Sequence, residues 1–81
     1  MKSSEILLSL NHARLLVWIV DENTYCVKYE WADIKDGPVL VGTFGRGNDF
    51  ESACDDYLLH IRGKTLVFNY FGNRKEVTVL G

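Results

Sequence analysis

The sequence predicts an α+β fold, in which one main helix packs on a face of a single antiparallel sheet. The 81 residues, of which 47% are hydrophobic and 25% charged, have an ordinary globular composition and suffice for one small domain, residues 1–81. Residues 24–31 alternate between polar and apolar side chains, as a half-buried strand does. Residues 50–61 instead repeat apolar side chains at helical spacing. The predicted order of elements is α-β-β-β-α-β-β.

The N-terminal half is predicted to hold a short helix and three strands. Ser3 or Ser4 is a suitable cap for the helix. Residues 15–20 are apolar on both alternating faces and rich in β-branched side chains, which predicts a central strand. The strand over residues 24–31 pairs with it as a hairpin, and residues 39–44 form a third strand after a Gly-Pro turn.

The main predicted helix covers residues 49–62. Asn48 is its expected N-cap, and Glu51 occupies the third position of a capping box. Gly63 stands where a glycine commonly ends a helix. The apolar stripe of this helix consists of Phe50, Ala53, Cys54, Tyr57, Leu58 and Ile61.

Two further strands are predicted after the main helix. Residues 65–70 are rich in β-branched and aromatic side chains, and residues 75–80 follow after a turn that contains Gly72. The two strands therefore form a second hairpin that completes the antiparallel sheet.

Three glycines, Gly42, Gly45 and Gly47, lie between the third strand and the main helix. The pattern predicts a sharp turn with left-handed backbone. The alternative is an anion site formed by backbone amides and Arg46, which the acidic start of the helix opposes. The spacing differs from that of the dinucleotide-binding fingerprint.

The sequence contains no constellation typical of catalysis, metal binding or cofactor binding, so we expect a protein that is not an enzyme. Asp55 and Asp56 are adjacent on the helix and diverge by about 100°, so they cannot share a proton. Cys54 belongs to the apolar stripe and is expected to be a buried thiol. No two of the soft or imidazole ligands stand at a metal-binding spacing. These ligands are His12, Cys26, Cys54 and His60.

Composition favours a cytoplasmic protein outside the membrane. The longest apolar run, residues 15–20, is far shorter than the roughly 20 residues of a membrane span. Two cysteines are fewer than small disulfide-stabilised secreted domains carry. The net charge of −2 at pH 7 differs from the basic charge of most nucleic-acid-binding proteins.

Acidic side chains gather on the main helix. We expect them to be exposed, because burying an unpaired carboxylate is costly. They form either a solvated helix face or a surface that docks on a basic partner. The four residues are Asp49, Glu51, Asp55 and Asp56.

Nucleic-acid binding through the C-terminal hairpin is the alternative function. Its cations would contact phosphates, and its aromatic rings would stack on bases. The order α-β-β-β-α over residues 1–62 is shared with double-stranded-RNA-binding domains. Acids stand where those domains carry lysines, which excludes that mode of RNA binding. The candidate contacts are Arg62, Lys64, Tyr70, Phe71, Arg74 and Lys75.

An aromatic sheet face is the second candidate interaction surface. The alternation places Tyr25, Tyr29 and Trp31 on one side of a strand. One long helix cannot cover both faces of the sheet, so we expect some of these aromatic residues, or Trp18, to be exposed and to contact an unidentified protein or a second copy. A homodimer would bury this face, or would pair edge strands through residues 24–31 or 75–80.

One further pattern spans residues 45–68. Its positions are Gly45, Gly47, Asn48, Glu51, Ala53, Cys54, Asp56, Tyr57, Ile61, Gly63, Lys64, Leu66, Val67 and Phe68. In these positions the segment resembles small proteins of phages and prophages, many of them from Gram-positive hosts. The resemblance implies a short accessory protein or inhibitor that works inside a bacterial cell and binds a host or viral protein.

Overall fold

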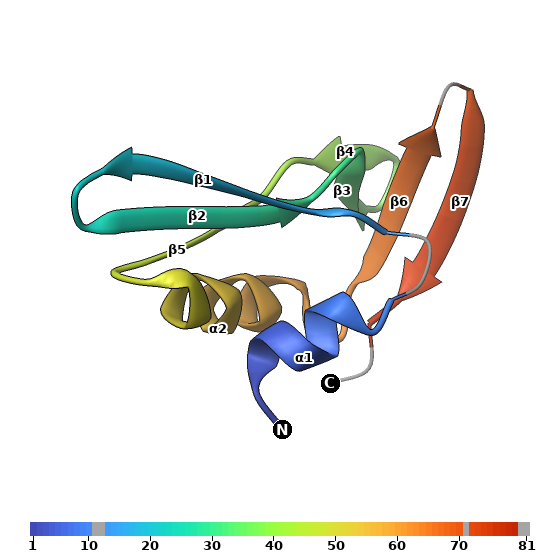
Figure 1. Ribbon diagram of the computed structural model, residues 1–81. Coiled ribbons are helices and arrows are strands. Elements are labelled where there is room, and N and C mark those ends of the chain that lie inside the picture. The colour runs from blue at the N-terminus through green and yellow to red at the C-terminus, as the bar shows by residue number, and fades with distance from the viewer. Residues whose placement is uncertain (11–12, 71, 80–81) are drawn as a thin grey trace.

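The computed structural model describes residues 1–10, 13–70 and 72–79, and it confirms the predicted α+β class (Figure 1). His12, Phe71 and Leu80, to which the sequence analysis gives possible roles, lie outside the described residues. The described elements are α1 (Ser3–Leu8), β1 (Leu15–Asp21), β2 (Thr24–Tyr29), β3 (Ala32–Asp36), β4 (Val39–Val41), β5 (Gly45–Gly47), α2 (Phe50–Ile61), β6 (Thr65–Tyr70) and β7 (Asn73–Thr78).

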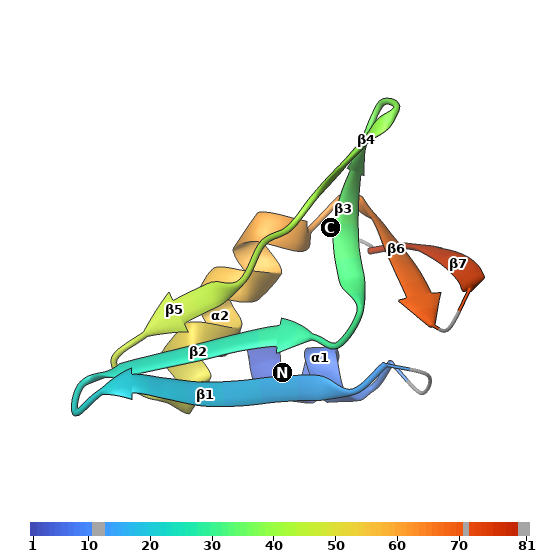
Figure 2. The same ribbon diagram turned by 90° about the horizontal axis from the view of Figure 1, so that it is seen from above.

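The strands form two antiparallel sheets, whereas the sequence predicts one. The strand orders are β1-β2-β5 and β4-β3-β6-β7. The chain passes from the first sheet to the second through a sharp bend between β2 and β3 (Figure 2). Trp31 lies in this bend with φ 64°, a left-handed conformation that bulky residues rarely adopt. The predicted strand over residues 24–31 therefore ends at Tyr29, because the bend interrupts its alternation.

Two strands, β3 and β5, are missing from the sequence-based prediction. β3 has the sequence ADIKD, whose charged residues hide its strand character, and it pairs with both β4 and β6. β5 consists of the glycine segment that the sequence predicts as a turn, and it pairs with β2. The predicted strand over residues 39–44 is consequently wrong in extent, since only residues 39–41 form β4.

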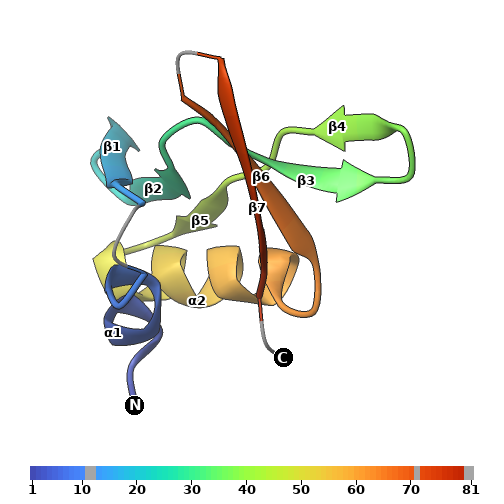
Figure 3. The same ribbon diagram turned by 90° about the vertical axis from the view of Figure 1, so that its right-hand side faces the viewer.

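The glycines of β5 allow helix α2 to lie directly against the sheet (Figure 3). A Cβ atom placed on Gly45 would overlap the backbone of Ala53 and Tyr57. A Cβ atom on Gly47 would lie 2.6 Å from the amide nitrogen of Ala53. Neither glycine has positive φ, so the predicted left-handed turn is wrong. The glycines are required by the close approach of two backbones.

The N-cap of helix α2 lies one residue later than predicted. Asp49, not Asn48, is the N-cap, and its carboxylate accepts a hydrogen bond from the Ser52 amide at 2.7 Å. The helix ends at Ile61, and Gly63 has φ 75°, as expected for a glycine after a helix. The prediction of this helix from its apolar spacing is confirmed.

The core lies between α2, β2 and β6, with α1 packed beside α2. Tyr57 is fully buried, and its ring meets the ring of Tyr29 edge to face with centroids 5.6 Å apart. The Tyr29 amide donates a hydrogen bond to the Tyr57 hydroxyl at 3.1 Å. The predicted stripe is buried except for Phe50, which is half-buried.

Strand β1 is an edge strand, although the sequence predicts a central one. It pairs only with β2 among the described strands. Residues 16–20 are all exposed, even though each is apolar. The reason is the position of α2, which packs on β5 and β2 and leaves β1 beyond its cover.

Candidate functional site

The acidic residues of α2 do not form one docking face. Glu51 joins the two helices, because its carboxylate accepts hydrogen bonds from the Ser4 hydroxyl at 2.6 Å and from the Ser4 amide at 2.9 Å. That amide is one of the first-turn donors that lack a partner within a helix. Glu51 is accordingly half-buried, and the prediction that it is substantially exposed is wrong.

The other three acids differ in their surroundings. Asp49 is exposed and caps α2. Asp56 is half-buried, accepts a hydrogen bond from the Arg46 amide at 2.9 Å and lies 3.6 Å from His60 Nδ1. Asp55 is exposed. The predicted exposure is therefore confirmed only for Asp49 and Asp55, because Glu51 and Asp56 accept hydrogen bonds from segments outside α2.

The hydrogen bonds that Ser4 donates to Glu51 lead to a prediction about how stability depends on pH. They hold the pKa of Glu51 below its ordinary value of 4.5. A depressed carboxyl pKa contributes stability that is present above the unfolded-state pKa and is lost as pH falls through the folded-state pKa. We expect Glu51→Gln to be less stable than the wild type at pH 7, with a difference that shrinks as the pH falls below the ordinary carboxyl range.

Urea denaturation at neutral and acidic pH measures this effect. Asp55→Asn is the matched control, since Asp55 accepts no hydrogen bond in the described part of the chain. The control removes a carboxylate of the same helix without breaking the contact between α1 and α2, so it should keep a stability near that of the wild type at pH 7. A constant difference between Glu51→Gln and the wild type at every pH would contradict the role of this carboxylate.

The aromatic residues of the predicted sheet face are largely internal. Tyr29 is only 3% exposed, and its hydroxyl donates a hydrogen bond to the Leu7 carbonyl at 2.6 Å. Tyr25 is half-buried against the core. Trp31, in the bend after β2, is 49% exposed. The expected exposed face is wrong for the tyrosines because α2 covers that side of β2.

The basic residues of the C-terminal hairpin lie in two separate groups. Arg62 and Lys64 precede β6, whereas Arg74 and Lys75 pair with residues near its other end. At about 3.3 Å per residue, roughly 16 Å of strand separates the groups. Arg74 also lies 3.5 Å from Glu76. The structure therefore does not gather these four cations into one site.

The cysteines are internal and lie on opposite faces of the first sheet. Cys54 is fully buried on the helix side, and burial raises the pKa of its thiol to about 11. A protonated thiol is a poor nucleophile. Cys26 is 2% exposed on the face of β2 that points away from α2, opposite Trp18 and Arg46. Within the described residues, no cluster of three or more His, Cys, Asp or Glu side chains could hold a metal ion.

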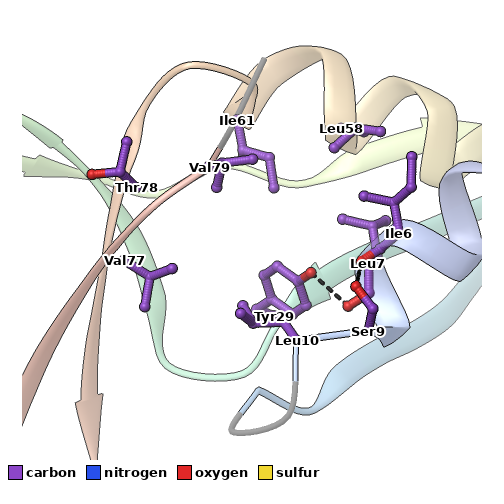
Figure 4. Close-up of a pocket in the computed structure, with 10 residues that line it drawn as sticks. All are labelled: Ile6, Leu7, Ser9, Leu10, Tyr29, Leu58, Ile61, Val77, Thr78 and Val79. Atoms are coloured by element: carbon purple, nitrogen blue, oxygen red, sulfur yellow. Dashed lines mark hydrogen bonds between the residues drawn. The ribbon is translucent and has the colours of Figure 1, made fainter.

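An apolar cleft of about 260 Å³ lies between α1, the end of α2 and β7 (Figure 4). Its walls are mainly aliphatic, and the hydroxyl of Tyr29 points to the Leu7 carbonyl inside it. The described residues that line it include no carboxylate, imidazole, ammonium or thiol group. The one phenol in its lining, that of Tyr29, donates its hydroxyl hydrogen to the Leu7 carbonyl.

A second, open cleft of about 320 Å³ brings together residues that the sequence analysis does not connect. Thr43, Arg46, Asp56 and His60 line it, together with Phe44. Asp56 is placed to orient His60. The described structure contains no hydrogen bond between Thr43 and His60, which an activated hydroxyl nucleophile would require. The cleft is an open recess beside Phe44.

An exposed cluster of apolar and aromatic side chains lies on the sheet face that points away from α2. Val17 of β1 is opposite the buried Val27, which faces the helix, so the neighbouring Leu16 and Trp18 point to the other side. The ring of Phe44 packs against Trp18 with centroids 5.9 Å apart. We call Leu16, Trp18 and Phe44 the outer patch; they are 37%, 39% and 46% exposed.

Leu16 and Phe44 of the outer patch are absent from the sequence-based candidates, whereas Trp18 is among the aromatic residues expected on an uncovered face. The reason is that residues 15–20, being apolar throughout, are typical of a strand buried on both faces. The exposure of Trp18 follows from the mismatch between two apolar faces and a single long helix to cover them.

The chain matches no protein-family model, no curated protein and no solved structure. None of the helices in the described part of the chain has the length and apolar character that crossing a membrane demands.

Proposed function

We propose that this chain is a non-enzymatic interaction protein of the phage-accessory type, which binds a host or viral protein through the outer patch. The observation that carries the proposal is the contact between Trp18 and Phe44, two large aromatic side chains that remain well exposed on one sheet face. Exposed aromatic clusters are typical of protein interfaces, where such side chains supply much of the binding energy.

The surroundings of the patch suit a protein partner. Phe44 and Arg46 also line the open cleft beside α2, which provides a recess for a side chain of the partner. Arg46 is exposed at its rim, where a polar group fits the usual anatomy of an interface. The resemblance of residues 45–68 to small phage and prophage proteins supports a partner in the bacterial cell.

The test is affinity capture from a bacterial lysate with tagged wild type, Phe44→Ser and Leu59→Ser. Phe44→Ser removes a ring from the outer patch, whereas Leu59, at 70% exposed, is an apolar residue of α2 outside the patch. We expect Leu59→Ser to retain the proteins bound by the wild type and Phe44→Ser to lose them. Circular dichroism melts establish that both variants are folded.

Identical capture by Phe44→Ser and the wild type would contradict the role of the outer patch. A nuclease-treated sample separates proteins bound directly from those bound through nucleic acid.

A second candidate function is single-stranded nucleic-acid binding by the same face. Lys28 and Arg46 point to the side of the sheet that carries Trp18 and Phe44, so cations and stacking rings occur together. An electrophoretic shift at low and moderate salt tests it. Binding that is strong, steeply salt-dependent and lost in Phe44→Ser would favour nucleic acid over protein.

A further inference from the structure

The outer patch does not account for all the exposed apolar surface of β1. Val17 and Ile19 point to the helix side of the sheet, yet they are 47% and 60% exposed. A partner that covers only the outer face would leave these two side chains in water. Both faces of β1 are therefore uncovered, together with its edge.

The edge of β1 is open to another strand. In Figure 2, β1 lies at one margin of the three-stranded sheet, and β2 and then β5 follow on one side of it, so its opposite edge has no neighbouring strand among those described. An edge strand presents unpaired backbone N–H and C=O groups at alternate residues. Natural edges usually carry charges or proline, but β1 contains no proline and its only charged residue is Asp21 at its end. The one irregularity in the pairing with β2 comes after Ile19.

We infer that a second copy of this chain pairs with β1 in antiparallel orientation, about a two-fold axis at Trp18, to form a continuous six-stranded sheet. The inference rests on the proposed function in that the outer patches of both copies would join into one binding face. In this register, Trp18 lies opposite its own symmetry mate, and Val17 lies opposite Ile19 of the second copy. On each face of β1, the exposed side chains would then contact those of the paired strand as cross-strand neighbours.

The charges at the two ends of β1 favour a second copy of the chain as the partner, and they favour this antiparallel register. Arg14 precedes β1 and Glu22 follows it, and both are exposed. The two-fold axis at Trp18 places Arg14 of each copy beside Glu22 of the other. The Arg14 side chain is 78% exposed, and its contact with Glu30 is long, at 3.6 Å. A parallel arrangement in register would instead oppose like charges, which is unfavourable across strands.

The expected dimer is weak. One pair of strands with its flanking side chains covers less than the roughly 800 Å² per partner of a standard interface. We therefore expect association at micromolar concentrations, with the mass rising from 9.3 kDa toward twice that value as concentration increases.

Light scattering and sedimentation equilibrium, from low to several hundred micromolar, measure this association. Ile19→Lys introduces a charge at the proposed interface on an exposed side chain and should remain monomeric throughout. Leu59→Lys, also on an exposed apolar residue but in α2, should dimerise like the wild type. Thermal melts confirm that both variants are folded. A wild-type mass of 9.3 kDa at every concentration, or dimerisation of Ile19→Lys, overturns the inference.

A charge exchange tests the register. Arg14→Glu alone and Glu22→Arg alone should each weaken the dimer several-fold, because each sets like charges side by side. The double variant should recover affinity relative to Arg14→Glu. Arg14→Glu and the double variant both lack the contact between Arg14 and Glu30, so its loss does not affect the comparison of their dimer affinities. A double variant as weak as the single ones overturns this register.

The outcomes separate this inference from the proposed function. A monomeric chain whose capture of lysate proteins depends on Phe44 overturns the dimer and supports the outer patch as a binding site. The opposite outcome is a dimer that Ile19→Lys disrupts, together with equal capture of lysate proteins by the wild type and Phe44→Ser. That outcome supports the strand pairing and overturns the proposed function.

Discussion

Gly45→Ala is expected to destabilise the protein by about 3 kcal/mol or more, a large part of the 5–15 kcal/mol that usually stabilises a domain. The added methyl group would overlap the backbone of Ala53 and Tyr57 in α2. A backbone cannot rotate away as a flexible side chain can, so the helix must move from the sheet and loosen the core. For a domain of this size, the melting temperature should fall by roughly 12 °C or more.

Gly42→Ala is the matched control for this substitution. A Cβ atom on Gly42 would lie 3.5 Å from the Asp33 carboxylate, which is an ordinary contact. Neither Gly42 nor Gly45 has positive φ, so the comparison isolates the close approach of the helix from backbone strain. Calorimetric melts of the two variants measure the difference. Equal melting temperatures would show that α2 does not rest on β5 as described.

Leu58→Ala is expected to cost about 2–5 kcal/mol, because the substitution leaves a cavity in the core. Leu58 is 2% exposed and belongs to the cluster that joins α2 to the sheets. The neighbouring Leu59 is 70% exposed, so Leu59→Ala should change stability by no more than about 0.5 kcal/mol. Both substitutions place alanine in the same helix, which makes helix propensity nearly equal in the two variants.

Urea denaturation of the two leucine variants provides the measurement. The midpoint should fall for Leu58→Ala and stay near the wild-type value for Leu59→Ala. Similar midpoints for both variants would mean that the buried stripe of α2 has been assigned to the wrong face of the helix.

The elements that the sequence predicts well are those specified by contacts between near neighbours. The helix over residues 50–61 follows from its apolar spacing, and Gly63 marks its end because the backbone there is left-handed. Strands at β1, β2 and β6 follow from β-branched and aromatic residues.

The same local patterns did not identify the N-cap or the roles of the acids. Asp49 and Asn48 are both good caps, and only the geometry of the chain entering α2 selects Asp49. Glu51 fits a capping box in the sequence, but it accepts its hydrogen bonds from Ser4, which is 47 residues away. Rules based on the spacing of residues within a helix cannot predict a contact between residues so far apart in the sequence.

The sequence by itself determined the fold class, the main helix and the apolar character of β1. Only the tertiary structure decided that the chain bends at Trp31, that the strands divide into two sheets and that β1 lies at an edge. The physical reason is the close packing of α2 on the glycines of β5. This packing places the helix over β5 and β2, so the helix does not cover β1, which is apolar on both faces.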